Sequence, residues 1–173
     1  PKVVAELEKE KAGKLTRRDA ITGDRVAVQF ADPRAEVDGA RAEPGTEHPL
    51  FKNKDARQAI ALCIPRDVLA AEIYGNGAKP VSNNLAAPKR FVSPNTTWEF
   101  NPDKAKELLS AIPEAAGFKL LFQTSVTATR QKAQEVIKQY LTQVGFDVEL
   151  KSIDAAVFFS ADAGNPDTYT KFY

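Results

Sequence analysis

The most constraining feature of this sequence is the order of segments after Gly117, where strand-like and helix-like patterns alternate. Residues 119–124 (KLLFQT) are typical of a strand, and residues 128–144 repeat apolar side chains at the spacing of an amphipathic helix. Residues 147–152 (DVELKS) follow Gly145 as a second strand, since glycine commonly ends a helix. This order predicts a βαβ unit with neighbouring parallel strands, a right-handed crossover and an α/β fold class.

Helical patterns also occur earlier in the chain. Residues 3–12 are typical of a short charged helix. Residues 53–63 and 65–74 are expected to form two helices, with Pro65 in the first turn of the second because proline fits a helix start.

Strand and loop patterns occupy most of the remaining chain. Residues 25–30 (RVAVQF) alternate as a half-buried strand does. Residues 31–49 form a polar segment that is long for a loop in a compact domain, so we expect it to be functional or packed along another surface. Residues 76–101 are rich in turn formers, and residues 155–160 are expected to open a further helix.

A strong helix start lies at Asn101-Pro102-Asp103, which offers a cap, a proline at the first helical position and an acid in the first turn. The helix that follows repeats apolar residues at helical spacing, as does the segment 128–144. We expect Leu109 and Ile137, which lie on these apolar stripes, to be buried.

Charge and composition narrow the classes of function. The chain carries 24 basic and 23 acidic residues, a net charge of +1. It therefore lacks the excess of positive charge that is typical of proteins that bind nucleic acid or an anionic membrane. No apolar run approaches the roughly 20 residues needed to span a bilayer. The chain contains no Met and begins PKVVAELEKE, so it is expected to be excised from a longer protein.

Residues suited to catalysis are scarce in the sequence. Nucleotide, hydrolase and zinc-protease motifs are missing. His48 is the sole histidine and is expected to be solvated or hydrogen-bonded locally, while Cys63 is expected to be a buried, inert thiol. The spacing of Asp32, Asp38 and Glu43 matches no calcium motif. We therefore expect no catalytic residue, no metal and no cofactor.

The segment 48–75 (HPLFKNKDARQAIALCIPRDVLAAEIYG) resembles a signature of the family 5 solute-binding proteins, the oligopeptide, dipeptide and nickel-binding group. The matching residues are Leu50, Phe51, Arg57, Gln58, Ala59, Ile60, Ile64, Arg66 and Asp67. Ala56 stands where the family usually has Val, and Pro65 stands where an Asp usually caps the second helix. Proline at a helix start preserves the turn, so the second departure leaves the resemblance intact.

The resemblance extends to NPDKAKELLSAI (101–112), preceded by a proline-rich loop with Trp98, and to the strand, helix and strand of residues 119–154. It covers roughly residues 24–173 and implies most of one lobe of a periplasmic binding protein type II-like (cluster C) fold, with a mixed sheet flanked by helices. Residues 1–23 would lead into this lobe, and the family's acidic segment would lie just beyond Tyr173.

The resemblance implies the solute-binding component of an ABC importer, which captures a peptide or similar small solute between two lobes. Its partners would be that ligand, the permease and the other lobe of the same protein, with no nucleic acid. The location implied is periplasmic or extracytoplasmic, with a lipoprotein anchor in the full-length protein. Two alternatives stay open: an enzyme on a similar βαβ scaffold with catalytic residues elsewhere, and a sensor or chaperone built on the binding-protein scaffold.

Ligands of open α/β sheets bind at the carboxyl ends of the strands. The expected strands end near Gln29, Thr124, Ser125 and Ser152, whose groups can hydrogen-bond a solute; each can equally be a cap or turn residue. Thr127 is better explained as the cap of the long helix. For Trp98, ligand stacking or lobe contact and simple anchoring of its loop are equally good interpretations.

Overall fold

A computed structural model of the chain describes residues 6, 9, 10, 13, 24–28, 36, 37, 40, 41, 45–75, 77–81 and 89–158. The chain groups into two compact units: unit 1 is Pro1–Arg25 with Arg66–Thr97, and unit 2 is Val26–Pro65 with Trp98–Tyr173. The boundary at residue 23 that was expected from the sequence stays a prediction.

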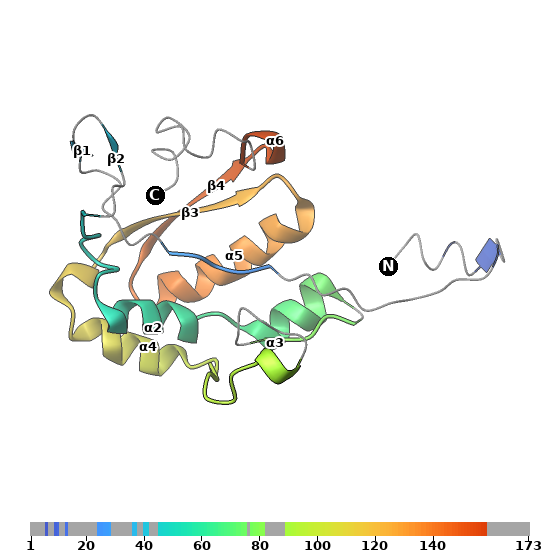
Figure 1. Cartoon of the computed structure of the whole chain (residues 1–173), viewed down its shortest axis with the longest axis horizontal. Helices are drawn as coiled ribbons and strands as arrows, with labels where there is room; N and C mark the ends of the chain where they lie inside the picture. The colour runs from blue at the N-terminus through green and yellow to red at the C-terminus, as the bar shows by residue number, and fades with distance from the viewer. Residues whose placement is uncertain are drawn as a thin grey trace. The chain divides into compact units, whose positions relative to one another are not determined.

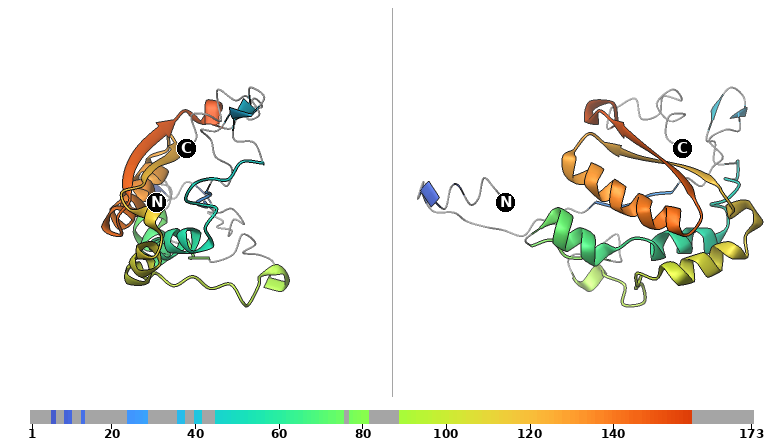
Figure 2. Two further views of the ribbon diagram at one scale, coloured as in Figure 1. Left: turned by 90° about the vertical axis from the view of Figure 1, so that its left-hand side faces the viewer. Right: turned by 180° about the vertical axis from the view of Figure 1, so that it is seen from behind.

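The central feature of unit 2 is a pair of parallel strands. β3 (Lys119–Ser125) pairs with β4 (Asp147–Ile153) in a register that runs from Lys119 opposite Asp147 to Ser125 opposite Ile153. α5 (Ala128–Gln143) connects the strands and packs on both of them, as a second layer along the sheet (Figures 1 and 2). The predicted α/β class and the predicted parallel pair are therefore confirmed.

The C-terminus of α5 shows why this helix ends where it does. Gly145 has a φ of 114°, a backbone conformation that residues with a Cβ rarely adopt. Its N–H donates to the carbonyl of Thr142 (3.1 Å), and the N–H of Phe146 donates to the carbonyl of Leu141 (3.1 Å). This is the Schellman arrangement, and the accompanying burial of Phe146 turns the chain directly into β4.

Two further helices of unit 2 pack against each other, α2 (Lys54–Leu62) and α4 (Pro102–Ser110). Each has an asparagine cap: Asn53 Oδ1 accepts from the N–H of Asp55 (2.8 Å), and Asn101 Oδ1 accepts from the N–H of Lys104 (2.9 Å). The cap at Asn101 was predicted from the sequence, whereas for α2 only a helix over residues 53–63 was predicted, without its cap. The Asn101 N–H also donates to the carbonyl of Leu62 (2.9 Å), which ties the start of α4 to the end of α2.

Small side chains allow α2 and α4 to approach closely. Ala56, Ala59 and Ala105 are all fully buried, at 0% exposure. A larger residue at any of them would have to displace the side chains or backbone packed around it. Leu109 and Ile137 are also buried, so the predicted apolar faces of α4 and α5 are confirmed.

The segment after α2 differs from the single helix expected over residues 65–74. Pro65 is buried, and α3 (Arg66–Val68) passes into a π-helical turn, η1 (Leu69–Tyr74). The N–H of Gly75 donates to the carbonyl of Ala70, five residues back, and Gly75 has a φ of 77°. Within unit 1, the Tyr74 hydroxyl donates to Asp24 Oδ2 (2.7 Å).

Two expectations for the first third of the chain need correction. Val26 and Val28 are half-buried and Ala27 is exposed, as predicted, but residues 24–28 are not a strand, since no described strand pairs with them. The segment 31–49, expected to be a loop, contains an antiparallel pair, β1 (Glu36–Val37) and β2 (Ala40–Arg41).

The other described elements are short. They are η2 (Lys89–Phe91), η3 (Pro113–Ala115) and α6 (Ala155–Phe158), the last at the place where a further helix was expected. In the expected helix 3–12 the described residues Glu6, Lys9 and Glu10 are helical, and its other residues lie outside the described part.

Gln134 joins α5 to both strands through polar contacts. Its side chain is 3% exposed, and its Nε2 donates to the carbonyls of Phe122 (2.5 Å) and Lys151 (3.2 Å). One amide therefore reaches a carbonyl on each strand and holds the strands beneath the helix.

Replacement of Ile137 by Ala is expected to lower the free energy of unfolding by about 2–5 kcal/mol, because it leaves a cavity between α5 and the sheet. Glu135→Ala, an exposed position on the same helix, is the matched control and is expected to stay within about 0.5 kcal/mol of the wild type. Urea unfolding followed by circular dichroism measures both. Equal effects of the two changes would contradict the packing of α5 described above.

Replacement of Gln134 by Glu is expected to cost about 1–3 kcal/mol of unfolding free energy, because a carboxylate cannot donate to the two carbonyls and lies buried. Gln139→Glu makes the same chemical change at an exposed position of α5 and is expected to be nearly neutral. The same unfolding measurement compares them at pH 7. A Gln134→Glu chain as stable as the Gln139→Glu chain would show that the bridge contributes nothing.

Candidate functional site

The carboxyl ends of β3 and β4 bring together three of the hydroxyl side chains singled out from the sequence. Thr124 is paired with Ser152, and Ser125 with Ile153. Since paired residues of parallel strands lie on the same face, Thr124 and Ser152 are neighbours. Thr124 is half-buried and Ser152 is exposed, whereas Ser125 is 1% exposed.

The first turns of α5 supply polar partners for these hydroxyls. The Arg130 guanidinium donates to Ser125 Oγ (2.8 Å), and Gln131 Nε2 donates to Ser152 Oγ (3.1 Å). The buried Ser125 hydroxyl thus fixes the position of a cation at the end of β3. Sequence reasoning missed Arg130, Gln131 and Gln134; the only available signal was their place in the first turns of a helix that follows a strand.

The start of α5 lies at this same edge of the sheet. Thr127 occupies the N-cap position in an extended conformation, but its side chain makes no capping hydrogen bond, so the sequence interpretation of Thr127 holds only for its position. Its backbone carbonyl accepts from the N–H of Gln131 (2.9 Å). The edge therefore combines hydroxyls, a guanidinium and the positive end of a helix dipole, a set that suits carbonyl or carboxylate oxygens.

The two other predicted ligand-binding residues are Trp98 and Gln29. Trp98 is half-buried and lies shortly before α4, and both interpretations of it stay open. Gln29 lies outside the described residues. The predicted site residues thus stay predictions, and among the strand-end residues the fold places Thr124 opposite Ser152.

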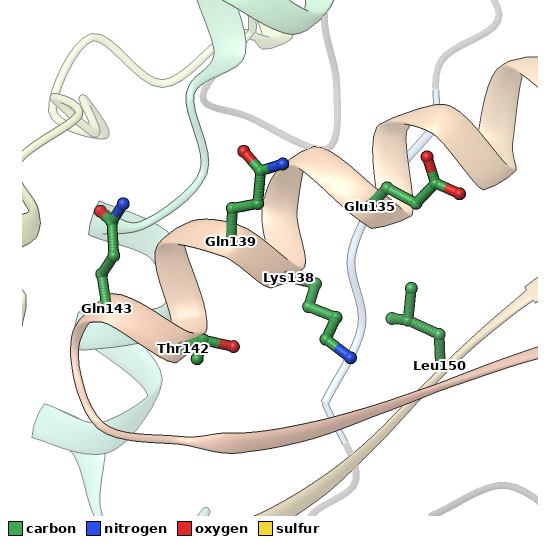
Figure 3. A pocket seen from close by; sticks show the side chains of 6 residues that line it. All are labelled: Glu135, Lys138, Gln139, Thr142, Gln143 and Leu150. Carbon is green, nitrogen blue, oxygen red and sulfur yellow. The ribbon is translucent and has the colours of Figure 1, made fainter.

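Two shallow hollows run along α5 beside β4, and the smaller of them reaches Ser152 at a strand end. The larger, of about 630 Å³, is lined by Glu135, Lys138, Gln139, Thr142, Gln143 and Leu150 (Figure 3). A second, of about 390 Å³, is lined by Ala128, Gln131, Lys132, Gln134, Glu135, Leu150 and Ser152. Figure 3 shows Lys138 and Leu150 directed into the space between helix and strand. The linings mix both charges with amides and match no single class of ligand.

Groups suited to covalent or metal chemistry are buried or apart from one another. Burial raises the pKa of the Cys63 thiol to about 12, so this thiol stays protonated at neutral pH. His48 is buried and locally hydrogen-bonded rather than solvated. In the part of the chain that the structure describes, His, Cys, Asp and Glu side chains form no group of three able to hold a metal ion. Nor does any helix there have the length and apolarity required to cross a bilayer.

Comparison with known proteins identifies relatives of this chain. The sequence profile of a family described as bacterial extracellular solute-binding proteins, family 5 Middle, matches residues 2–171. The glutathione-binding protein GsiB of Pectobacterium atrosepticum is 31% identical over 106 residues, which are 61% of this chain and 21% of that protein. The glutathione-binding protein GsiB of Escherichia coli K12 is 28% identical over the same shares.

Solved structures of binding proteins share the fold. An oligopeptide-binding protein from Thermus thermophilus, complexed with a pentapeptide, has a TM-score of 0.55 and 22% identity, over 63% of this chain and 21% of that one. Clavulanic acid biosynthesis oligopeptide binding protein 2 has a TM-score of 0.57 and 21% identity, over 71% and 24%.

The matched part of the chain spans 21% of the length of the curated relatives named above. The family match, in contrast, covers residues 2–171, which is nearly the whole sequence. The chain therefore belongs to the bacterial extracellular solute-binding proteins, family 5.

Proposed function

We propose that this chain is part of the solute-binding component of an ABC importer and supplies one lobe of a cleft that captures a peptide or similar small solute. In this proposal the whole protein is periplasmic or otherwise extracytoplasmic, possesses a lipoprotein anchor, and delivers the solute to a permease. The observation that carries the proposal is the polar edge formed by Thr124, Ser125, Ser152, Arg130 and the start of α5.

The chemistry of this edge supports a peptide-like solute. A peptide presents carbonyl oxygens and a terminal carboxylate, and both accept hydrogen bonds. The edge offers a guanidinium held by Ser125 (2.8 Å) and the amino end of α5. Relatives named for glutathione binding and a solved relative complexed with a pentapeptide support the same class.

Capture between two lobes is supported by the geometry and by the length of the relatives. Thr127 and Ser152 of the polar edge are exposed in this chain, whereas ligand sites in two-lobed proteins are enclosed by hinge closure. The chain covers about a fifth of each curated relative, so much of the cleft would lie outside it. Each contact that the absent lobe would supply is worth about 1 kcal/mol for a neutral hydrogen bond.

The isolated 173-residue chain is expected to bind glutathione or a pentapeptide far more weakly than the intact protein, since every tenfold in affinity corresponds to about 1.4 kcal/mol. Titration calorimetry on both proteins, with both probes, measures the difference. Equal affinities would show that the site lies within this chain alone, and would exclude the two-lobe clamp. An intact protein that binds neither probe would exclude a peptide-like solute.

Two matched threonine variants of the intact protein test whether the ligand binds at the strand ends or elsewhere on the surface. Thr124→Val keeps the shape of the side chain and removes its hydroxyl, so the affinity is expected to fall about fivefold if one hydrogen bond is lost. Thr142→Val makes the same change at an exposed position near the other end of α5 and is expected to leave the affinity unchanged. Unchanged affinity in the Thr124→Val protein would remove Thr124 from the site.

A further inference from the structure

β4 has an edge that β3 does not cover. In the part of the chain that the structure describes, β4 pairs with β3 alone. At the two ends of this ladder, the N–H of Asp147 donates to the carbonyl of Phe118 (3.0 Å), and the N–H of Val126 donates to the carbonyl of Ile153 (2.9 Å). Successive residues of a strand direct their backbone groups to alternate edges. The residues of β4 whose N–H and C=O groups point away from β3 are therefore Val148, Leu150 and Ser152.

The surface beside this edge is hollowed. Both hollows along α5 have Leu150 in their lining, and Figure 3 shows its side chain directed into the larger one. Ser152 contacts Gln131 of α5, so this alternate set of β4 residues presents its side chains to the face of the sheet that α5 covers. A strand added along β4 would therefore bring its own covering layer into the larger hollow, beside α5.

The charges on the other face of β4 indicate which strand fits. Glu149 and Lys151 flank Leu150 and lie on the face away from α5. Charged side chains ordinarily protect an edge strand, because an arriving strand places apolar or like-charged groups against them. A second β4 that runs antiparallel, with Leu150 opposite Leu150, instead places Glu149 of each copy opposite Lys151 of the other. The edge is thus complementary to itself.

Bonding and charge both favour this register over its neighbours. A shift by one residue would set outward-pointing backbone groups against groups that already bond to β3. A shift by two residues in one direction places Lys151 opposite Lys151, and a shift by two in the other direction places Glu149 opposite Glu149. Like charges directly opposite each other are destabilising, so the pair centred on Leu150 is the favoured one.

The helix layer is compatible with the same pairing. α5 packs on both β3 and β4 (Figures 1 and 2), and the two-fold symmetry of an edge-to-edge pair places both copies of α5 on one face of the joined sheet. Their axes would be two strand spacings apart, roughly 9–10 Å, which is an ordinary distance between packed helices. The helices would run antiparallel, and the side chains along the hollow include Glu135 and Lys138, opposite charges that such a pair can bring together.

We propose that the outer edge of β4 is a self-association surface, at which two copies of the protein pair their β4 strands antiparallel about Leu150. This association goes beyond solute binding and requires no solute. Each copy supplies the same residues, so the contact closes on itself and the product is a dimer. A strand of unrelated sequence has no reason to match the order of Glu149 and Lys151 around Leu150, whereas a second copy matches it by symmetry.

Sedimentation velocity on the intact protein without solute, across micromolar concentrations, tests the pairing. We expect the wild type to show a monomer–dimer equilibrium. Glu149→Lys and Lys151→Glu each place like charges opposite one another in both symmetric pairs, so each is expected to raise the dimer dissociation constant about tenfold. The double variant, with both changes, restores opposite charges and is expected to return the constant to near that of the wild type.

Glu114→Lys is the matched control, because it makes the same change of charge at an exposed position outside β4 and α5. It is expected to leave the dissociation constant unchanged, which separates strand pairing from an effect of net charge. A wild type that stays monomeric would overturn the proposal. A dimer that the single changes do not weaken, or that the double change does not restore, would overturn it as well.

Amide hydrogen exchange on the wild type gives a second test that needs no variant. In the proposed pair the N–H of Leu150 donates to the carbonyl of Leu150 in the other copy, so its exchange is expected to slow as the protein concentration rises. The N–H of Glu149, which points to β3, is expected to exchange slowly at every concentration. Protection of Leu150 that does not depend on concentration would show that a strand of the same protein covers the edge, and would overturn the proposal.

Discussion

The parallel pairing of β3 with β4 is the constraint that positions the other features of unit 2. Parallel strands cannot be joined by a tight turn, so the chain must return along the full length of the sheet, and α5 is that return. The same helix consequently meets two different environments. Its later turns bury Ile137 and Leu141, while its first turns place Arg130 and Gln131 over the carboxyl ends of the strands. The topology thus places the polar first turns of α5 at the carboxyl ends of the strands and its apolar later turns farther along the sheet.

Much of this architecture could be predicted because it depends on local signals. Gly145 ends α5, Asn53 and Asn101 cap their helices, and the strands flanking α5 have clear patterns. The failures have a different origin. The π-helical turn η1 depends on backbone bonding that residue type does not encode, and a strand at residues 24–28 requires a partner that the pattern alone cannot supply. The pair β1 and β2 had a usable signal, since an Asp-Gly step lies between them in the sequence.

The hydroxyl residues of the candidate site could be predicted from the sequence, whereas the side chains that hydrogen-bond to them could not. Thr124 and Ser125 could be chosen because strand ends are where α/β sheets bind ligands. From the sequence, Arg130 and Gln131 are expected to be ordinary solvated helix residues. Only the register of β3 with β4 and the position of α5 show that they contact Ser125 and Ser152. The N-cap position of Thr127 follows from the sequence, but its side-chain rotamer, which makes no capping bond, does not.

The burial of Cys63 has a practical consequence for biosensor design. It is the sole cysteine of the chain, fully enclosed and protonated at neutral pH, so it does not compete with an added thiol for a maleimide dye. Val126 and Val157, exposed just after β3 and β4, are suitable places for such a thiol. A fluorophore there would lie beside the proposed ligand edge. Within these 173 residues, no native cysteine therefore needs to be removed before such a label is added.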